Sequence, residues 1–414
     1  MSNQLNWKRI IFSSSILLII VLLLEIFVQP ANYINLNLLR KFFEKVTASQ
    51  YIAPKQLFIN VWRITKNTYI DKDMNNQNWT YWKIRYVKKI KTIDDVNVAV
   101  NSMLASLNDS YSSFLMSNSY SKRRMKIDSK ITGVGVFVEE VGSEIVINQV
   151  VYNSSADMEN IQVGDVIVSI DGKKVNTEKL DEVIEALVIG EKDSVSVTIK
   201  RNNVLMTKKL TSKDIPIQTM KYEITDDNIG IITLSNIMGQ KAVLDFSRIL
   251  YLTNKTNGII IDLRNNYGGL VMNAVQMAGF MMNEKEIVQI KSRANRQLRI
   301  FSEKDSIFQE KPIVVLVNAK TASAAEILAG TLQVNLGAVL IGERTYGKNV
   351  IQQVIPMHNR TGLVITTDKY ILPNGEDIYK VGIKPDIFVV NEGKKDRQLE
   401  EAKKLINEVV KNKK

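Results

Sequence analysis

The chain has 414 residues, of which 45% are hydrophobic and 24% are charged, as is typical of a globular protein with two or three domains. It has no cysteine and one histidine, His358, which excludes a disulfide framework and a cysteine nucleophile and argues against a zinc site. The formal net charge is +12, but the lysines are spread along the chain without a recognised nucleic-acid module. We therefore expect no nucleic-acid partner, no metal and no cofactor.

An apolar stretch near the N-terminus predicts on which side of a membrane the rest of the protein lies. Residues 10–28 are mainly apolar, follow Lys8 and Arg9, and have about the minimum length for a membrane-spanning helix. Because basic residues mark the cytoplasmic side of such a span, everything after residue 30 is expected to be exported. Residues 28–31 lack the small-x-small pattern of a cleavage site, so we predict an uncleaved signal anchor, with a cleaved signal peptide as the alternative.

Residues 31–126 are expected to be mostly helical. The stretch 70–91 is polar and aromatic and receives no assignment. The apolar positions expected in the core of this region are Leu57, Val61, Ile64, Val98, Met103 and Leu107.

Residues 127–212 are predicted to form a separate, strand-rich module. A tight turn is expected at Asp171 and Gly172, and an amphipathic helix at 179–187. The expected strands are 133–138, 144–147, 165–170 and 195–199.

This order of elements, and the segment 163–172 in particular, resembles a PDZ domain. The resemblance implies that Gly133, Val134, Gly135 and Val136 form a loop whose N–H groups bind the carboxylate at a peptide C-terminus. The peptide would then add as a strand to the edge of the sheet. A strand-rich module without a ligand is the alternative.

A pair of glycines follows the next buried strand. Residues 258–261 are apolar and lead into 262–269, whose last two residues are Gly268 and Gly269. Paired glycines let the backbone approach a ligand closely and direct N–H groups towards it. An ordinary turn is the alternative.

Ser323 lies where a strand is expected to turn into a helix. Residues 312–317 are a continuous apolar run, and 324–332 is strongly helix-forming. Unpaired N–H groups and the positive end of the helix dipole would stabilise an oxyanion beside this serine. The alternative is that Thr321 or Ser323 only caps the helix.

Lys348 is the expected base, because a nucleophilic serine in this chain has no imidazole partner. It follows the apolar run 338–342 and the loop 343–347. Lowering the pKa of a lysine from about 10.4 to about 7 requires roughly 4–5 kcal/mol, which burial can supply. Gln352 is expected to accept a hydrogen bond from the amine and to orient it. A solvated surface lysine is the alternative.

These segments resemble the C-terminal processing peptidases, which use a serine–lysine dyad. Family members contain Leu-Arg-x-Asn-Pro-Gly-Gly, Ser-Ala-Ser-Ala-Ser-Glu and Gly-Lys-x-x-x-Gln, and the matching segments here are 263–269, 321–326 and 347–352. The stretches 366–370, 373–375 and 382–387 also fit, so the resemblance covers nearly the whole chain after residue 50.

The resemblance assigns a role to each matching residue. It implies that Ser323 is the nucleophile, Lys348 the general base and Gln352 its orienter. The N–H groups of Gly268 (or Gly269) and Ala324 would form the oxyanion hole.

Several positions depart from the family pattern. Tyr267 stands where the family usually has proline, Ala325 where it has serine, and Val334 where many members have aspartate. None of these changes removes the serine, the lysine or the glutamine. An altered turn at Tyr267 is expected to affect catalytic efficiency rather than the chemistry.

The predicted fold is a multidomain chain of α/β and α+β type. The C-terminal helix is expected to pack through Leu399, Ala402, Leu405, Ile406 and Val409. The predicted divisions are a signal anchor (1–30), a mostly helical region (31–126), a PDZ-like domain (127–212), a serine/lysine protease core (213–391) and a C-terminal helix with a basic tail (392–414).

The expected function is that of a serine endopeptidase held by one span in a bacterial inner membrane, with its body in the periplasm. Its partners would be the membrane and polypeptide substrates bound by their C-termini. An activating adaptor and a homo-oligomer are further partners that the sequence leaves open. A catalytically inactive scaffold that keeps the peptide-binding groove is the alternative.

Overall fold

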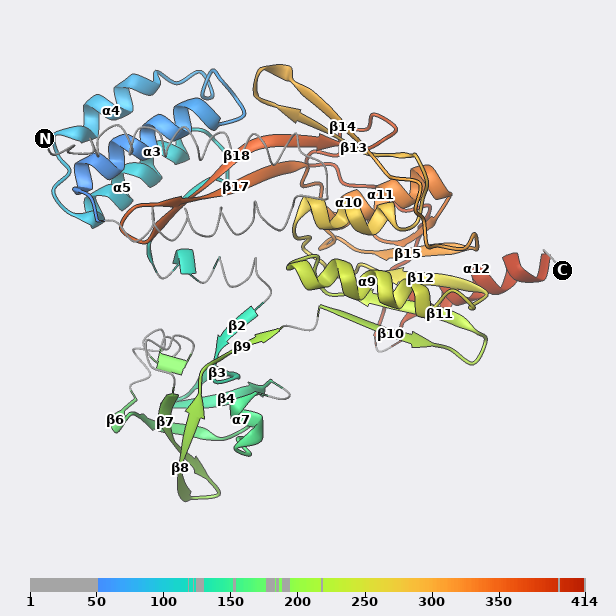
Figure 1. Cartoon of the computed structure of the whole chain (residues 1–414), viewed down its shortest axis with the longest axis horizontal. Coiled ribbons are helices and arrows are strands. Elements are labelled where there is room, and N and C mark those ends of the chain that lie inside the picture. Colours follow the sequence, from blue (N-terminus) through green and yellow to red (C-terminus); the bar gives the residue numbers. More distant parts are fainter. Residues whose placement is uncertain are drawn as a thin grey trace, which may run out of the picture. The chain divides into compact units, whose positions relative to one another are not determined.

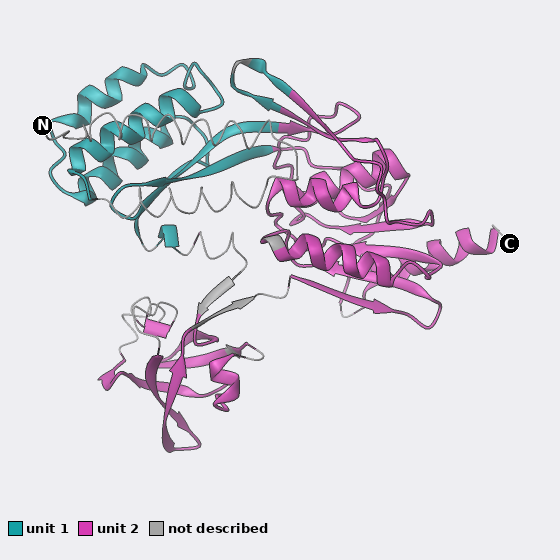
Figure 2. Ribbon diagram, viewed as in Figure 1, with its two compact units in different colours: residues 1–121, 291–297, 350–369 teal, residues 122–290, 298–349, 370–414 magenta. Residues whose placement is uncertain are grey.

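The computed structural model describes residues 51–412, apart from 118, 122, 124–129, 152–153, 176–182, 184–185, 188–193, 217–218 and 394. The expected signal anchor lies outside the described residues. Within them, no helix combines the length and the apolar character needed to cross a membrane. Figure 2 shows the two compact units of the chain: unit 1 contains residues 1–121, 291–297 and 350–369, and unit 2 contains the rest.

Unit 1 packs helices against strands that are distant in the sequence. β18 pairs antiparallel with both β1 and β17, and its Leu363 and Ile365 share a hydrophobic cluster with the three helices (Figure 1). The elements are α3 (Pro54–Thr68), α4 (Trp79–Val87), α5 (Ile93–Ala105), β1 (Ser113–Leu115), β17 (Val350–Met357) and β18 (Thr361–Ile371), whose last two residues belong to unit 2.

The burial of α5 follows its helical period. Thr92 and Asp95 form a reciprocal capping box that starts the helix. Val96 and Val100, one turn apart, face the core. Val98 lies on the opposite side of the helix and is 62% exposed, so its expected place in the core was wrong. The other expected core positions are buried or, for the last, partly buried: Leu57, Val61, Met103, Leu107 and Ile64.

The strand-rich module forms an antiparallel sheet in the order β3-β4-β5-β7-β8, in which β3 is an edge. Asp171 and Gly172 both have positive φ, as a two-residue hairpin requires. The expected helix 179–187 lies largely outside the described residues, although Val183 and Leu187 are buried. The strands are β3 (Val136–Val141), β4 (Glu144–Val150), β5 (Val166–Ile170), β6 (Lys173–Lys174), β7 (Ser194–Arg201) and β8 (Val204–Thr211), with the short helix α7 (Ser155–Met158).

Two further strands stand at the ends of this module. β2 (Lys130–Gly133) leads into it and β9 (Lys213–Pro216) leads out of it, and the two strands pair antiparallel. Within the module, an ion pair joins the end of β7 to the residue before β5. Arg201 Nε lies 2.6 Å from Asp165 Oδ1.

The core of unit 2 is a six-stranded sheet in the order β10-β11-β12-β15-β16-β19, parallel except for β10. Every residue of β12 and β15 is buried, as expected for central parallel strands. The strands are β10 (Met220–Ile224), β11 (Ile229–Leu234), β12 (Gly258–Asp262), β15 (Ile313–Val317), β16 (Val339–Gly342) and β19 (Ile387–Phe388). The helices are α9 (Gln240–Leu252), α10 (Val271–Gly279), α11 (Ala324–Leu336) and α12 (Arg397–Asn412).

The C-terminal helix α12 closes one face of this sheet. Its Ala402 and Ile406 are buried against Ile260 and Val314 of the central strands. Gly258 permits the close approach, because a Cβ atom at this position would lie 2.6 Å from the Ile406 side chain.

A hairpin projects between β12 and β15 in the sequence. It consists of β13 (Glu286–Ser292), a 3-10 turn (Arg293–Asn295) and β14 (Gln297–Phe301). Its tip, 291–297, belongs to unit 1, where Arg293 Nη1 donates to the Tyr69 carbonyl at 2.7 Å.

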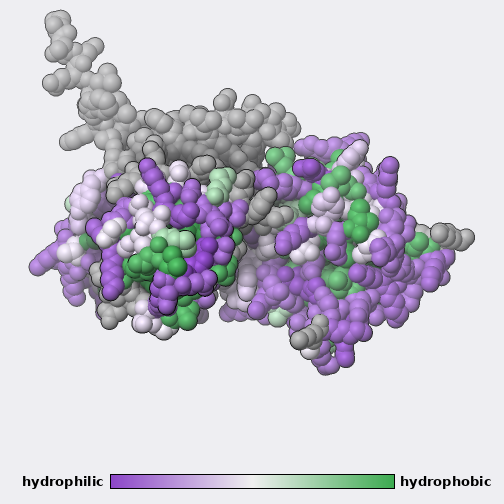
Figure 3. Space-filling model, turned by 90° about the horizontal axis from the view of Figure 1, so that it is seen from below, coloured by the Kyte–Doolittle hydropathy of each residue, from purple (hydrophilic) through white to green (hydrophobic). Residues whose placement is uncertain are grey.

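The face of the molecule shown in Figure 3 is mainly hydrophilic, with hydrophobic residues in separate groups.

Candidate active site

Ser323 occupies a strained turn between β15 and α11. Its φ of 59° and ψ of −123° are rarely adopted by a residue with a side chain, and such strain is typical of functional sites. The Ser323 N–H donates to Glu326 Oε2 at 2.8 Å. Thr321 does not cap the helix: its hydroxyl donates to the Leu263 carbonyl at 2.9 Å and ties the turn to the neighbouring loop.

The loop that carries Lys348 follows β16 and meets the same carboxylate. The Lys348 N–H donates to Glu326 Oε2 at 2.9 Å, and the Gly347 N–H donates to Oε1 at 2.7 Å. Because one oxygen accepts from both Ser323 and Lys348, their backbone nitrogens are separated by at most the sum of two hydrogen bonds. The structure thus brings together two segments that the sequence singled out separately.

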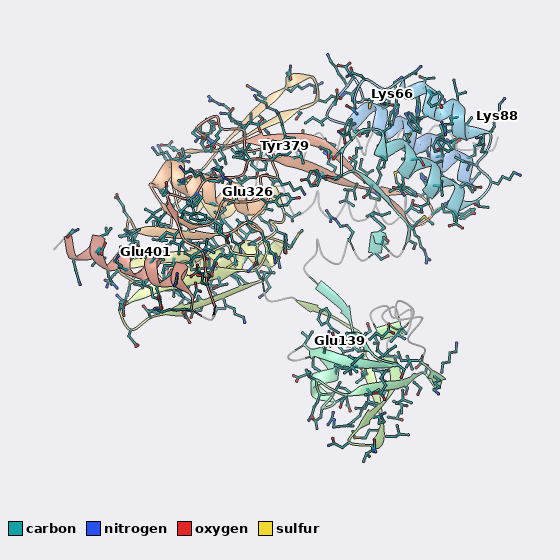
Figure 4. The ribbon with its side chains drawn as sticks, turned by 180° about the vertical axis from the view of Figure 1, so that it is seen from behind. Lys66, Lys88, Glu139, Glu326, Tyr379 and Glu401 are labelled. Carbon is teal, nitrogen blue, oxygen red and sulfur yellow. The ribbon has the colours of Figure 1, made fainter. Side chains whose placement is uncertain are left out.

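Glu326 is fully buried and joins these segments. Its fourth donor is the Thr345 hydroxyl, and all four donors are neutral. Burial raises the pKa of the Glu326 carboxyl above its ordinary value, although the four hydrogen bonds act in the opposite direction. Figure 4 labels this residue within the core of unit 2. The role of Glu326 was not predicted from the sequence, although the spacing of Ser323 and Glu326 is that of a capping box.

A buried tyrosine lies next to both segments. Tyr370 is the penultimate residue of β18, and its hydroxyl lies 3.1 Å from the Ser323 carbonyl oxygen and 2.9 Å from that of Lys348. The sequence signal for Tyr370 was only its place in a stretch that fits the family.

The glycine loop after β12 lies directly against the serine turn. Gly268 has a φ of 92°, and a Cβ atom added there would lie 3.0 Å from Ser323 Cβ and 2.9 Å from Ala324 N. The Gly268 N–H itself donates to Asn266 Oδ1 at 2.8 Å. Among the hydrogen bonds of the described residues, none is donated by the N–H groups of Gly269 and Ala324.

Tyr267 is the residue of this loop that departs from the family pattern. Tyr267 is 67% exposed, so its ring adds nothing to the buried part of the turn. Asn266, which is fully buried, holds the turn instead: its Nδ2 donates to the Leu234 carbonyl at 2.9 Å while its Oδ1 accepts from Gly268.

A cluster of charged side chains stands where β12 ends. The Arg264 guanidinium donates to both oxygens of Asp262 and to both oxygens of Asp396, at 2.6 to 2.9 Å, and it also reaches Gln398. Burial opposes ionisation of the Asp396 carboxyl, but the hydrogen bonds from Arg264 and its other donors lower its pKa overall. This cluster joins the glycine loop to the start of α12.

The remaining expected site residues lie in other parts of the fold. Gln352 is on β17 in unit 1, where its Nε2 donates to Thr366 Oγ1 at 3.3 Å. His358 is in the turn between β17 and β18 of the same unit, and burial lowers its pKa.

The expected carboxylate-binding loop, Gly133 to Val136, leads into the edge strand β3. Gly135 has a φ of 92°. The Val134 N–H donates to the Leu187 carbonyl at 3.0 Å, and the Val134 carbonyl accepts from the Ala156 N–H at 2.9 Å. In the described part of the chain, no group of three or more His, Asp or Glu side chains could hold a metal ion.

Three family models match separate parts of the chain. Residues 228–389 match peptidase family S41, residues 132–211 match the PDZ domain, and residues 53–103 match the C1 domain of tricorn protease. The carboxyl-terminal-processing protease of Picosynechococcus sp. is 33% identical over 360 residues, which cover 83% of this chain and 85% of that protein. This chain belongs to the carboxyl-terminal-processing proteases of peptidase family S41.

Two further relatives agree with this assignment. The carboxy-terminal processing protease CtpA of Bacillus subtilis is 32% identical over 323 residues, covering 77% of this chain and 69% of that protein. The solved structure of the photosystem II D1 C-terminal processing protease superposes with a TM-score of 0.55 at 27% identity, covering 82% and 94% of the two chains. The protein is therefore a serine-type peptidase with a PDZ domain, as the sequence predicted. Nothing in these matches favours an inactive scaffold.

Proposed function

We propose that Ser323 and Lys348 form the catalytic dyad of this protease. The observation that supports the proposal best is the shared acceptor: Glu326 Oε2 receives the N–H groups of both residues. A buried carboxylate that fixes both backbones predefines the distance between nucleophile and base, and such positioning supplies a large part of the rate of an enzyme. Ser323 and Lys348 are each only partly buried, unlike Glu326.

The proposed reaction is acyl transfer in two steps. Ser323 Oγ attacks the carbonyl carbon of the scissile bond, and its proton passes to the neutral Lys348 Nζ. When the tetrahedral intermediate collapses, the C–N bond breaks and Lys348 returns the proton to the leaving amine. Water then attacks the acyl-enzyme and gives its proton to Lys348. The ester bond to Ser323 Oγ breaks, Lys348 returns the proton to Ser323 Oγ, and the carboxyl product leaves. Gln352 is proposed to orient the lysine amine.

The oxyanion of the intermediate needs N–H groups beside Ser323. Ala324 is the first residue of α11, where the helix dipole also favours negative charge. Of the two glycines, Gly269 is the better second donor, since the Gly268 N–H is already bonded to Asn266. Gly268 then contributes by its lack of a side chain, which lets the loop touch the serine turn.

The PDZ domain is proposed to bind the C-terminus of the substrate. The loop from Gly133 to Val136 would receive the carboxylate, and β3, which is an edge strand among the described strands of this sheet, would pair with the peptide. Residues 1–30 are proposed to anchor the protease in a bacterial inner membrane, with its body in the periplasm, because Lys8 and Arg9 precede the apolar stretch.

The full-length chain in detergent micelles, with a disordered protein as substrate, tests the dyad. Ser323→Ala and Lys348→Ala are each expected to lower kcat by about 10³-fold or more. Lys320→Ala, an exposed lysine in the same turn, is the matched control and should cleave normally. Cleavage at the normal rate by either dyad variant would show that the dyad is assigned wrongly.

The PDZ assignment has its own test. A substrate peptide with a C-terminal amide in place of the carboxylate should show a higher KM at an unchanged kcat. Equal KM values for the two peptides would contradict the proposed carboxylate loop.

A further inference from the structure

Tyr370 is held in place by its backbone as well as by its ring. Its N–H donates to the Asn349 carbonyl at 2.8 Å, and Asn349 Nδ2 donates to the Tyr370 carbonyl at 3.3 Å. The side chain is fully buried. Because Asn349 directly follows Lys348, the tyrosine is fixed beside the residue that carries the expected base.

The Tyr370 hydroxyl has a single proton and two acceptors within reach. It lies 2.9 Å from the Lys348 carbonyl oxygen and 3.1 Å from the Ser323 carbonyl oxygen. A three-centre hydrogen bond of this kind forms only while the two carbonyl groups converge on one point. Burial, and then the nearby Glu326 carboxyl, raise the pKa of Tyr370 well above its ordinary value, so the phenol stays protonated and keeps donating.

Glu326 and Tyr370 therefore make complementary contacts. Glu326 accepts the N–H groups of Ser323 and Lys348, and Tyr370 donates to the carbonyl groups of the same two residues. The Ser323 carbonyl is also held by the start of α11, because it accepts from the N–H groups of Glu326 at 2.8 Å and Ile327 at 3.1 Å. Tyr370 therefore ties the Lys348 backbone to a serine turn that the helix has already fixed. Tethering both the nitrogen and the oxygen of Lys348 fixes the direction of its Cα–Cβ bond.

We propose that Tyr370 is a positioning residue, whose hydroxyl aligns the backbones of Ser323 and Lys348 so that their side chains meet. The proposal rests on the proposed Ser323–Lys348 dyad. A lysine side chain has four rotatable bonds, so the amine reaches the serine in a narrow geometry only if its Cα is well placed.

A role in packing alone is the competing explanation, because Tyr370 is among the largest fully buried side chains. The two roles differ in what the loss of the oxygen atom does. A packing residue affects the fraction of folded enzyme, whereas a positioning residue affects the turnover of each folded active site.

The test compares Tyr370→Phe with Tyr379→Phe, a partly exposed tyrosine nine positions further along the chain that is labelled in Figure 4. Active sites in the full-length protein are counted with a fluorophosphonate that labels the nucleophilic serine. We expect Tyr370→Phe to lower kcat per labelled site by about 10-fold or more, with KM for a short peptide unchanged. The acid limb of the pH profile of kcat/KM should also move, whereas Tyr379→Phe should leave all three quantities unchanged.

Two non-natural residues at position 370 keep the test valid if Tyr370→Phe folds poorly. 4-Methylphenylalanine fills the space of the hydroxyl but donates no hydrogen bond, and 4-aminophenylalanine keeps a donor. The first should lose turnover as Tyr370→Phe does, and the second should recover most of it.

The possible results separate the two proposals. Wild-type turnover with 4-methylphenylalanine, while Ser323→Ala is inactive, would overturn the positioning role alone. Normal cleavage by Ser323→Ala would overturn the dyad and, with it, the role of Tyr370. A loss confined to the number of labelled sites would show that Tyr370 only packs.

Discussion

Two clusters around carboxylates in unit 2 are built in opposite ways. Glu326 receives four neutral donors that belong to Ser323, Thr345, Gly347 and Lys348. Asp262 and Asp396 instead share one cation, the Arg264 guanidinium. A bond to a backbone N–H fixes the position of that backbone, whereas an ion pair holds two elements together. The Glu326 cluster therefore serves the geometry of the site, and the Arg264 cluster fastens α12 to the sheet.

The largest effect is expected when the neutral donors of Glu326 lose their acceptor. In Glu326→Gln, one oxygen becomes an NH₂ group that faces a backbone donor on whichever side it lies, so the side chain no longer accepts from all four groups that Glu326 joins. We expect kcat to fall by about 10²- to 10³-fold. Glu343→Gln is the matched control. Glu343 lies in the loop before Lys348, and the hydrogen bond that it donates to the Val317 carbonyl comes from its backbone N–H, which the substitution keeps. Comparable kcat values in the two variants would remove the distinction between the clusters.

Breaking the second cluster should affect stability more than catalysis. Arg264→Met leaves the buried Asp262 without its cation, and it also frees Asp396, which is partly exposed and therefore costs less. We expect the free energy of unfolding to fall by about 2–3 kcal/mol, measured by urea denaturation. The kcat per active site should stay within a factor of a few. A large loss of kcat at unchanged stability would mean that this cluster also sets the geometry of the site.

The glycine loop lies between the two clusters and gives a sharper test. A methyl group on Gly268 would lie 2.5 Å from the Ala322 carbonyl oxygen, in a backbone with a φ of +92°. Gly375 has a similar φ of +84° with no atom within 4 Å. Both alanine variants carry the same backbone strain, but only Gly268→Ala disturbs the serine turn. We expect its kcat to be about 10-fold lower than that of Gly375→Ala. Equal kcat values would show that the contact has no role.

These comparisons also show what the sequence could provide. The apolar runs before Ser323 and Lys348, and the helix-forming stretch after the serine, were enough to place both residues in segments that follow buried strands. The multidomain α/β fold with a PDZ domain and the family assignment are confirmed. The position of Val98 was predicted wrongly, because its side chain lies on the outer side of α5.

The contacts that hold the site together could not be read in the same way. Glu326 meets Lys348 across 22 positions of sequence, and Tyr370 meets Ser323 across 47. Such contacts depend on how α11, β18 and the loops that carry Ser323 and Lys348 come together in the folded chain. A local pattern of residues contains no information about that distance.

The smallest effect we predict is a difference in pH dependence between the clusters. The pKa of Asp396 is lowered in the folded state, so its contribution to stability is present above its ordinary value of 3.8 and is lost as the pH falls through the folded value. The pKa of Glu326 is raised, so its ionisation has the opposite sign: its contribution is present below its ordinary value of 4.5 and is lost as the pH rises through the folded value.

Asp396→Asn should therefore lower the free energy of unfolding by about 1 kcal/mol at pH 7, since solvent screens this partly exposed group, and by much less near pH 3. Asp226→Asn, an exposed aspartate, is the control and should show no such change between the two pH values. A deficit in Asp396→Asn that stays constant from pH 7 to pH 3 would mean that the charge of Asp396 does not contribute to stability, and that this side chain holds the start of α12 through hydrogen bonds that do not depend on its charge.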